Sequence, residues 1–174
     1  IYDIYFNPAI VFVGSFLILA LSGAFLLMLP SATTNGITFT NALFTSTSAV
    51  CVTGLTVVDT ATDFTFVGQS IILALFQLGG IGILTFTSFF AFFFRGSSSF
   101  KESLNTRDFI AHDGLKDVFR AALNVVIFTL GVEVVGALFI YSSIIGNDAI
   151  EDKVFFSIFH GVSAFCNAGF SIFS

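Results

Sequence analysis

The sequence has no tryptophan, little charge and few basic residues, and these shortages exclude several classes of protein. Charged side chains make up 10 % of the chain, whereas soluble globular domains carry roughly 25 %, so a water-soluble domain is excluded. Six basic residues and a net charge of -5 argue against nucleic-acid binding. Without tryptophan, the usual side-chain marker of a membrane–water interface is missing.

Cysteine and histidine are also scarce, with two of each, and their spacing matches no zinc site. Cys51 and Cys166 hold equivalent places in two related segments described below. A disulfide between them is one possibility, but we favour small buried thiols packed behind these segments, because free cysteine behaves as a small hydrophobic residue. No Ser/His or His/Glu pairing supports an intramembrane enzyme, so we expect neither enzymatic activity nor a covalent cofactor.

Hydrophobic residues, by contrast, form 56 % of the chain. They gather in three long runs that predict membrane-spanning helices over 10–29, 67–94 and 119–141. The first run has about 20 residues, which at about 1.5 Å per residue match a hydrocarbon core of about 30 Å. The second is longer than a bilayer requires and should tilt, kink or protrude. We therefore expect an all-α integral membrane protein.

A short, less apolar segment occurs twice between these runs. Ser48-Ala-Val-Cys-Val-Thr-Gly-Leu-Thr56 returns as Ser163-Ala-Phe-Cys-Asn-Ala-Gly-Phe-Ser171, with Ser, Ala, Cys and Gly at the same offsets. Each copy follows a predicted short helix, 41–48 with Thr40 as N-cap and 153–162 with Asp152 as N-cap. In a bilayer, irregular backbone survives only inside protein or beside a watery cavity. The repeat therefore favours a pore or transport pathway, while a pair of re-entrant turns with glycine only for geometry remains the alternative.

Basic residues set the expected orientation. Five of the six lie in or beside the connection between the second and third runs: Arg95, Lys101, Arg107, Lys116 and Arg120. The positive-inside rule places 95–120 in the cytoplasm and both repeated segments towards the outer face. We accordingly expect a first repeat over 1–95, a cytoplasmic connection over 96–117, and a second repeat over 118–174 that stops after its loop.

Two spans separate the copies, so both face the same side of the membrane. Parallel repeats favour a pore over a secondary transporter, whose repeats are usually inverted. On the outer side acidic residues outnumber the one base, Lys153, and could concentrate cations. Solvated caps and loop charges are the alternative for each of them: Asp59, Asp63, Asp148, Glu151 and Asp152.

Backbone carbonyls of the repeated segments could replace the hydration shell of a cation. Gly54 and Gly169 would permit the unusual backbone angles that this requires. Ser48 and Ser163 sit at the ends of the short helices, where the helix dipole places partial negative charge. The predicted ion-selectivity filter comprises two runs: Val50, Cys51, Val52, Thr53 and Gly54, and Phe165, Cys166, Asn167, Ala168 and Gly169.

Three further features lie near these segments. Glu133 is inside the third run, where an ionisable residue is a functional candidate; it could support the second loop by hydrogen bonds or lie in the cation path, and we favour support. The glycines of Gln77-Leu-Gly-Gly-Ile-Gly82 permit close helix approach or bending, and we favour close packing. We expect His160 to be a hydrogen-bonded packing residue rather than a ligand.

The segments 41–55 and 163–171 resemble the first and second pore loops of the Trk/Ktr/HKT potassium-uptake superfamily, and 77–82 resembles the helix after its first loop. The chain is most similar to the N-terminal part of the bacterial Trk/Ktr membrane subunit. The resemblance implies four parallel span–pore-helix–filter–span repeats around one pore, of which this chain would carry three spans and two re-entrant loops. It also implies that K⁺, the transported ion, is bound by backbone carbonyls of the filter residues.

The same resemblance implies a multi-pass protein of the bacterial plasma (inner) membrane, surrounded by lipid. It further implies a homodimer of the full-length chain and a cytoplasmic nucleotide-binding regulatory subunit. In the related plant transporters, serine at the first filter glycine goes with sodium preference, so Gly54 favours potassium. The alternative is a Na⁺-permeable or ion-coupled secondary transporter, a symporter, that uses the same loops.

Overall fold

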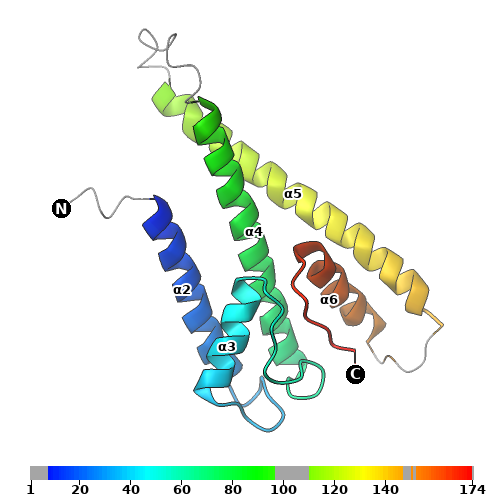
Figure 1. Cartoon of the computed structure of the whole chain (residues 1–174). Coiled ribbons are helices and arrows are strands. Elements are labelled where there is room, and N and C mark those ends of the chain that lie inside the picture. Colours follow the sequence, from blue (N-terminus) through cyan, green and yellow to red (C-terminus); the bar gives the residue numbers. More distant parts are fainter. Residues whose placement is uncertain (1–7, 97–109, 147–149, 151, 174) are drawn as a thin grey trace. The chain divides into compact units, whose positions relative to one another are not determined.

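The computed structural model describes residues 8–96, 110–146, 150 and 152–173, and the named elements among them are all helices (Figure 1). Their order is long, short, long, long, short, as the sequence predicts. With the labels of Figure 1 they are α2 (Pro8–Leu27), α3 (Phe39–Val50), α4 (Phe66–Gly96), α5 (Ile110–Ile144) and α6 (Lys153–Cys166). The expectation of an all-α chain is confirmed for these residues.

Two stretches are long and apolar enough to cross a membrane, Phe66–Phe86 in α4 and Ala122–Ile144 in α5. In α2 the corresponding apolar stretch, Phe12–Leu27, is shorter, so the first span remains a prediction. Large apolar side chains of α5 are strongly exposed, with Phe128 at 69 % and Phe139 at 71 %. Contiguous exposure of this kind suits contact with lipid or further helices rather than water.

The two short helices extend further than the sequence predicts, and one predicted cap was wrong. Thr38, not Thr40, caps α3, because Thr38 has the extended backbone that an N-cap requires and its Oγ1 accepts a hydrogen bond from the amide of Asn41. Thr40 lies within the helix. At α6 the predicted cap is confirmed, since Asp152 Oδ1 accepts from the amide of Phe155 at 2.9 Å.

Residues from both expected repeats build one compact unit, Ile1–Gly80 with Val132–Ser174, and Ile81–Gly131 forms a second unit. In the first, Phe76 of α4 meets Phe159 of α6 edge to face, with ring centroids 5.5 Å apart, and stacks on Phe170 at 6.1 Å. Each such pair adds about 0.5–1.5 kcal/mol beyond burial. These rings hold α4 against α6 and against the chain that follows α6.

Small residues bring α2 and α3 together in the same unit. The hydroxyl of Ser46, which is fully buried, donates to the carbonyl of Ala20 at 2.7 Å. Ala24 and Ala42 are also fully buried. With no bulky side chain at these positions the short helix lies close to its neighbour, and the C-terminal end of α3 is held inside the unit.

Candidate functional site

The two repeated segments have matching backbones where they leave α3 and α6. Val52 and Asn167, which hold the same place in the two copies, both have φ of 56°. Gly54 and Gly169 match in the same way, with φ of 70° and 71°. Because valine and asparagine differ in their local preferences, the shared left-handed conformation is a property of the position and not of one residue type.

Hydrogen bonds back to the helices also repeat. The amide of Thr53 donates to the carbonyl of Ser48 at 2.9 Å, and the amide of Ala168 donates to that of Ser163 at 2.8 Å. Both serines are 5 % exposed. Each loop is thus tied to the last turn of its own helix.

The serine hydroxyls differ between the copies. The Thr53 hydroxyl donates to Ser48 Oγ at 3.0 Å. The second copy has alanine at the position of Thr53, and there the Ser163 hydroxyl donates instead to the carbonyl of Phe170 at 2.7 Å. The predicted support residues therefore do contact the loops, by two different hydrogen bonds.

Gly54 and Gly169 lie against each other although they are far apart in the sequence. A Cβ on Gly54 would be 2.7 Å from the carbonyl oxygen of Ala168 and 2.9 Å from the Cα of Gly169. A Cβ on Gly169 would be 2.9 Å from the Cα of Gly54. Lack of space excludes a side chain at these two positions, and the left-handed φ disfavours one further.

The remaining predicted filter residues differ in exposure. Val50 and Ala168 are buried; Val52, Gly54, Phe165 and Cys166 are half-buried; Cys51, Thr53, Asn167 and Gly169 are exposed. Both cysteines are free. The expectation of a buried thiol was wrong for Cys51, because α3 ends at Val50 and the chain then leaves the core; Cys166 still belongs to the last turn of α6.

Three polar side chains from three helices meet at Cys166, in the second repeated segment. Glu133, on α5 and 4 % exposed, accepts a hydrogen bond at Oε2 from Gln77 Nε2 of α4 at 2.8 Å. The Cys166 thiol lies 3.8 Å from Gln77 Oε1 and 3.9 Å from Glu133 Oε1 and can donate to either. Buried polar groups need hydrogen-bond partners, and these three side chains serve as partners for one another.

His160 is hydrogen-bonded within the unit, as expected. Its Nδ1 lies 2.9 Å from the carbonyl of Phe156, while Nε2 accepts from the amide of Ile172 at 3.4 Å and lies 3.1 Å from Ser171 Oγ. Because Nε2 accepts, we assign the proton of the neutral ring to Nδ1. The histidine thereby links α6 to the chain just beyond Gly169.

Three of the acidic residues expected on the outer side, Asp59, Asp63 and Asp152, are described by the structure and have local roles. Asp63 Oδ2 accepts from the amide of Asp59 at 2.8 Å, and Asp59 Oδ1 accepts from that of Ala61 at 2.8 Å. With Asp152 as an N-cap, the cap and loop-charge alternative accounts for all three. Asp148 and Glu151 lie outside the described residues, as do Lys101, Arg107 and the side chains of Arg95 and Lys116.

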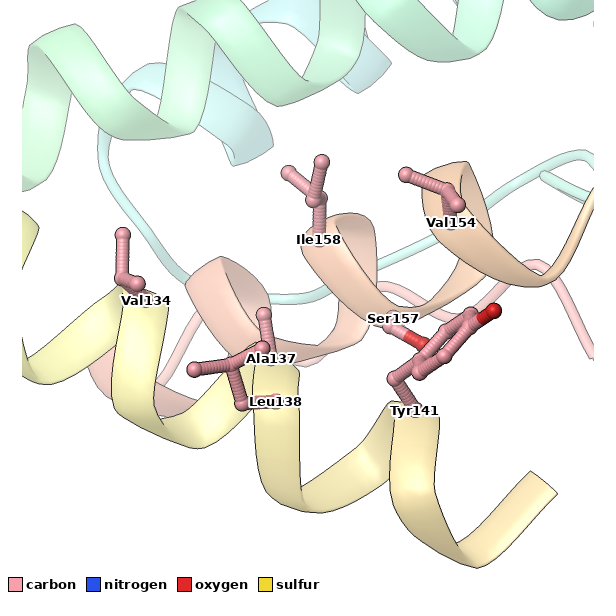
Figure 2. A pocket seen from close by; sticks show the side chains of 7 residues that line it. All are labelled: Val134, Ala137, Leu138, Tyr141, Val154, Ser157 and Ile158. Atoms are coloured by element: carbon pink, nitrogen blue, oxygen red, sulfur yellow. The ribbon is translucent and has the colours of Figure 1, made fainter. Parts of the chain in front are cut away.

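One cavity borders the repeated segments, and another lies apart from them. The first, of about 470 Å³, is lined by the end of each segment and by residues that follow it: Thr56, Val57, Val58, Asp59, Thr60, Gly169, Ser171 and Phe173. The other, of about 340 Å³, lies between α5 and α6 and is lined by Val134, Ala137, Leu138, Tyr141, Val154, Ser157 and Ile158 (Figure 2). The Ser157 hydroxyl donates to the Lys153 carbonyl, so this second cavity is chiefly apolar.

Sequence reasoning missed the left-handed conformation of Val52. Asparagine adopts positive φ more readily than most residues. Asn167 therefore indicates positive φ at its own position, and the repeat would have extended that prediction to the equivalent residue, Val52. Reasoning from the sequence also missed which residues the glycines after Gln77 contact. These contacts join residues that are distant in the sequence, and a glycine in a helix does not indicate which segment packs against it.

Comparison with known proteins identifies the family. The model of the TrkH family, described as cation transport protein, matches residues 5–174. Ktr system potassium uptake protein B of Bacillus subtilis is 36 % identical over 165 residues, which are 95 % of this chain and 37 % of that protein. Potassium/sodium uptake protein NtpJ of Enterococcus hirae is 34 % identical over 168 residues, with the same two shares.

A further relative, Ktr system potassium uptake protein B of Vibrio alginolyticus, is 35 % identical over 160 residues, which are 92 % of this chain and 35 % of that protein. The chain thus spans little more than a third of the length of these curated relatives. The resemblance drawn from the two loops is confirmed over nearly the whole chain. With two apolar helices of spanning length, the chain belongs to the TrkH family of membrane cation transport proteins.

Proposed function

We propose that the complete protein carries K⁺ across the bacterial inner membrane through a channel-like pathway, and that this chain supplies two segments of its selectivity filter. The observation that carries the proposal is the matched left-handed backbone of the two loops, with Gly54 and Gly169 in contact. Two segments that differ at Val52 and Asn167 and still adopt one unusual backbone there indicate a shared task for the main chain. The names of the relatives, which are potassium uptake proteins, support potassium as the ion.

In this proposal the carbonyls of the two filter segments replace water around the ion. The buried serines, Ser48 and Ser163, keep each loop folded against its helix, whose C-terminal end carries partial negative charge towards the ion. Glu133 acts through Gln77 and Cys166 to hold the second segment and does not bind the ion, because its carboxylate already has protein partners. The 470 Å³ cavity forms part of the outer entrance.

The remaining features rest on the apolar runs and the basic residues of the sequence for span and orientation, and on the family resemblance for further repeats and partners. The first apolar helix serves as a third span, residues 95–120 face the cytoplasm, and both loops open outwards. Two further repeats would close the pathway. The full-length chain forms a homodimer and is controlled by a cytoplasmic nucleotide-binding subunit.

The proposal is tested by Gly54→Ser in the full-length protein, reconstituted in vesicles with K⁺ or Na⁺ gradients. The added side chain would strike the Ala168 carbonyl and displace filter oxygens. Since K⁺ is larger and less tightly hydrated than Na⁺, we expect weaker K⁺ flux and a relative gain in Na⁺ flux. Gly169→Ser should act in the same direction with a smaller effect, and Cys51→Ala should be mild.

Gly131→Ser is the matched control, because a Cβ at Gly131 meets nothing within 4 Å. It should leave the K⁺/Na⁺ flux ratio unchanged. If both filter variants express normally and keep the ratio of the unmodified protein, the filter assignment is wrong.

A Na⁺-permeable or ion-coupled transporter is the second candidate, favoured by the relative named as a potassium/sodium uptake protein. The two mechanisms differ in coupling. A pore passes each ion down its own gradient, whereas a symporter accumulates K⁺ from equal concentrations on the two sides when only a Na⁺ gradient is imposed. Vesicle flux under that single condition separates them.

A further inference from the structure

Two adjacent glycines of α4 each lie against one of the repeated loops. A Cβ on Gly79 would collide with the carbonyl oxygen of Val50, the last residue of α3, and would be 3.0 Å from its Cα. A Cβ on Gly80 would be 2.8 Å from the Sγ of Cys166, the last residue of α6, and 3.4 Å from its Cβ. Neighbouring helical residues point about 100° apart, so one turn of α4 offers bare backbone in two directions.

Gln77 adds a polar contact on the side of Gly80. It precedes Gly80 by three residues, and residues so spaced share a face of the helix. Its amide donates to Glu133 and accepts from the Cys166 thiol. Cys166 therefore contacts α4 at two points: its sulfur packs against the bare backbone at Gly80, and its thiol faces the side-chain amide of Gln77.

We propose that Gln77, Gly79 and Gly80 form a shared seat that fixes the spacing between the two filter segments. They are positioning residues for ion selectivity, which act through Val50 on one segment and through Cys166 on the other. Val50 would thus contribute by placing Cys51–Gly54, since its own carbonyl lies against α4. This inference rests on the proposed filter function.

The contact between Gly54 and Gly169 makes the spacing sensitive to this seat. The two glycines are already closer than any side chain allows, so a displacement of either loop must alter their separation. Backbone meets backbone at Gly79, which leaves no flexible group to absorb a change. At Gly80 the opposing group is a single sulfur atom, and its removal offers a direct test.

The experiment compares Gly79→Ala, Gly80→Ala and the control Gly131→Ala in the full-length protein, with the K⁺/Na⁺ flux ratio and thermal stability measured for each. We expect both seat variants to lower the ratio several-fold, while the control keeps it. Ordinary helix packing would lower stability alone and leave the ratio of the folded fraction unchanged, which would overturn the inference.

A second substitution gives a rescue. Cys166→Ala removes the sulfur that the new Cβ would strike but also the thiol's contact with Gln77, so Gly80→Ala combined with Cys166→Ala should recover the ratio to that of Cys166→Ala alone. The same Cys166→Ala should not rescue Gly79→Ala, whose collision is with backbone. Equal effects of Cys166→Ala on both seat variants would refute the assigned contacts.

Gln77→Ala covers the case in which the glycine variants fail to fold, because it opens space instead of closing it. We expect a lower K⁺/Na⁺ ratio with the protein still folded, and an unchanged ratio would count against the seat. Gly54→Ser distinguishes a failure of the seat from a failure of the filter assignment on which it rests. If it alters selectivity while the three α4 variants do not, the seat is wrong and the filter stands; if it also has no effect, the filter assignment fails.

Discussion

At the scale of single residues, Asn167 occupies a conformation that valine adopts in the other loop. A left-handed backbone costs an ordinary side chain about 1–2 kcal/mol, and asparagine tolerates it better. Asn167 is exposed, so its replacement by Val should remove little packing and should lower stability by about 1 kcal/mol. Asn167→Gly should be nearly neutral. Thermal unfolding of the full-length protein measures both, and equal losses would show that backbone strain is not the cause.

His160 provides a second prediction at this scale. Its Nε2 is the acceptor for the Ile172 amide, three residues beyond Gly169. His160→Ala leaves that donor without its partner and should cost about 1 kcal/mol, whereas His160→Gln keeps an acceptor at a similar reach and should cost less. Thermal unfolding compares the two variants. A glutamine variant no better than the alanine variant would refute the hydrogen-bond role.

Several residue roles could be predicted from the sequence because the repeat marks them twice. The repeat marked Gly54 and Gly169, and both have positive φ in the structure. Asp152 was predicted as an N-cap for a different reason, because it is a polar residue directly before an apolar helix. The partners of Gly79 and Gly80 could not be predicted. They depend on packing between distant segments, and one sequence without such contacts gives no indication of which neighbour a bare helix face meets.

At the scale of elements, Glu133 joins α5 to α4 and to the end of α6. Glu133→Gln retains an acceptor for Gln77, so transport should largely persist. Glu133→Ala leaves buried partners without hydrogen bonds and should cost about 1–3 kcal/mol of stability. Flux and thermal unfolding of the full-length variants distinguish the roles, because equal loss of flux in both variants with normal folding would indicate that the charge itself is needed.

Each long helix contains most of a predicted hydrophobic run, although α5 begins at Ile110, well before the run at 119–141. The short helices were placed correctly but ended too early. The prediction stopped at Ser48 and Val162, whereas the helices continue to Val50 and Cys166. In both cases the helix ends where the backbone turns left-handed at the next one or two residues. Hydrophobic periodicity does not detect that turn, since small and apolar residues lie on both sides of it.

At the scale of the whole molecule, orientation is the main prediction. Five bases in 95–120 predict a cytoplasmic connection. In a full-length protein that carries Cys51→Ala and Cys166→Ala, a cysteine at position 98 should react with an impermeant reagent only from the cytoplasmic side. A cysteine at position 147 should react only from outside. The reverse pattern would move both loops to the inner half of the membrane.

The contact of Gln77 and Gly80 with Cys166 has a consequence for how the copies diverge. Gln77 and Gly80 belong to the expected first repeat, so the second loop depends in part on residues outside its own repeat. A bulkier residue at 166 would demand a compensating change at 77 or 80, which lie in the other expected repeat. Substitutions in the two repeats are coupled in this way, and a second repeat transplanted from another protein would lack the α4 residues that its loop contacts.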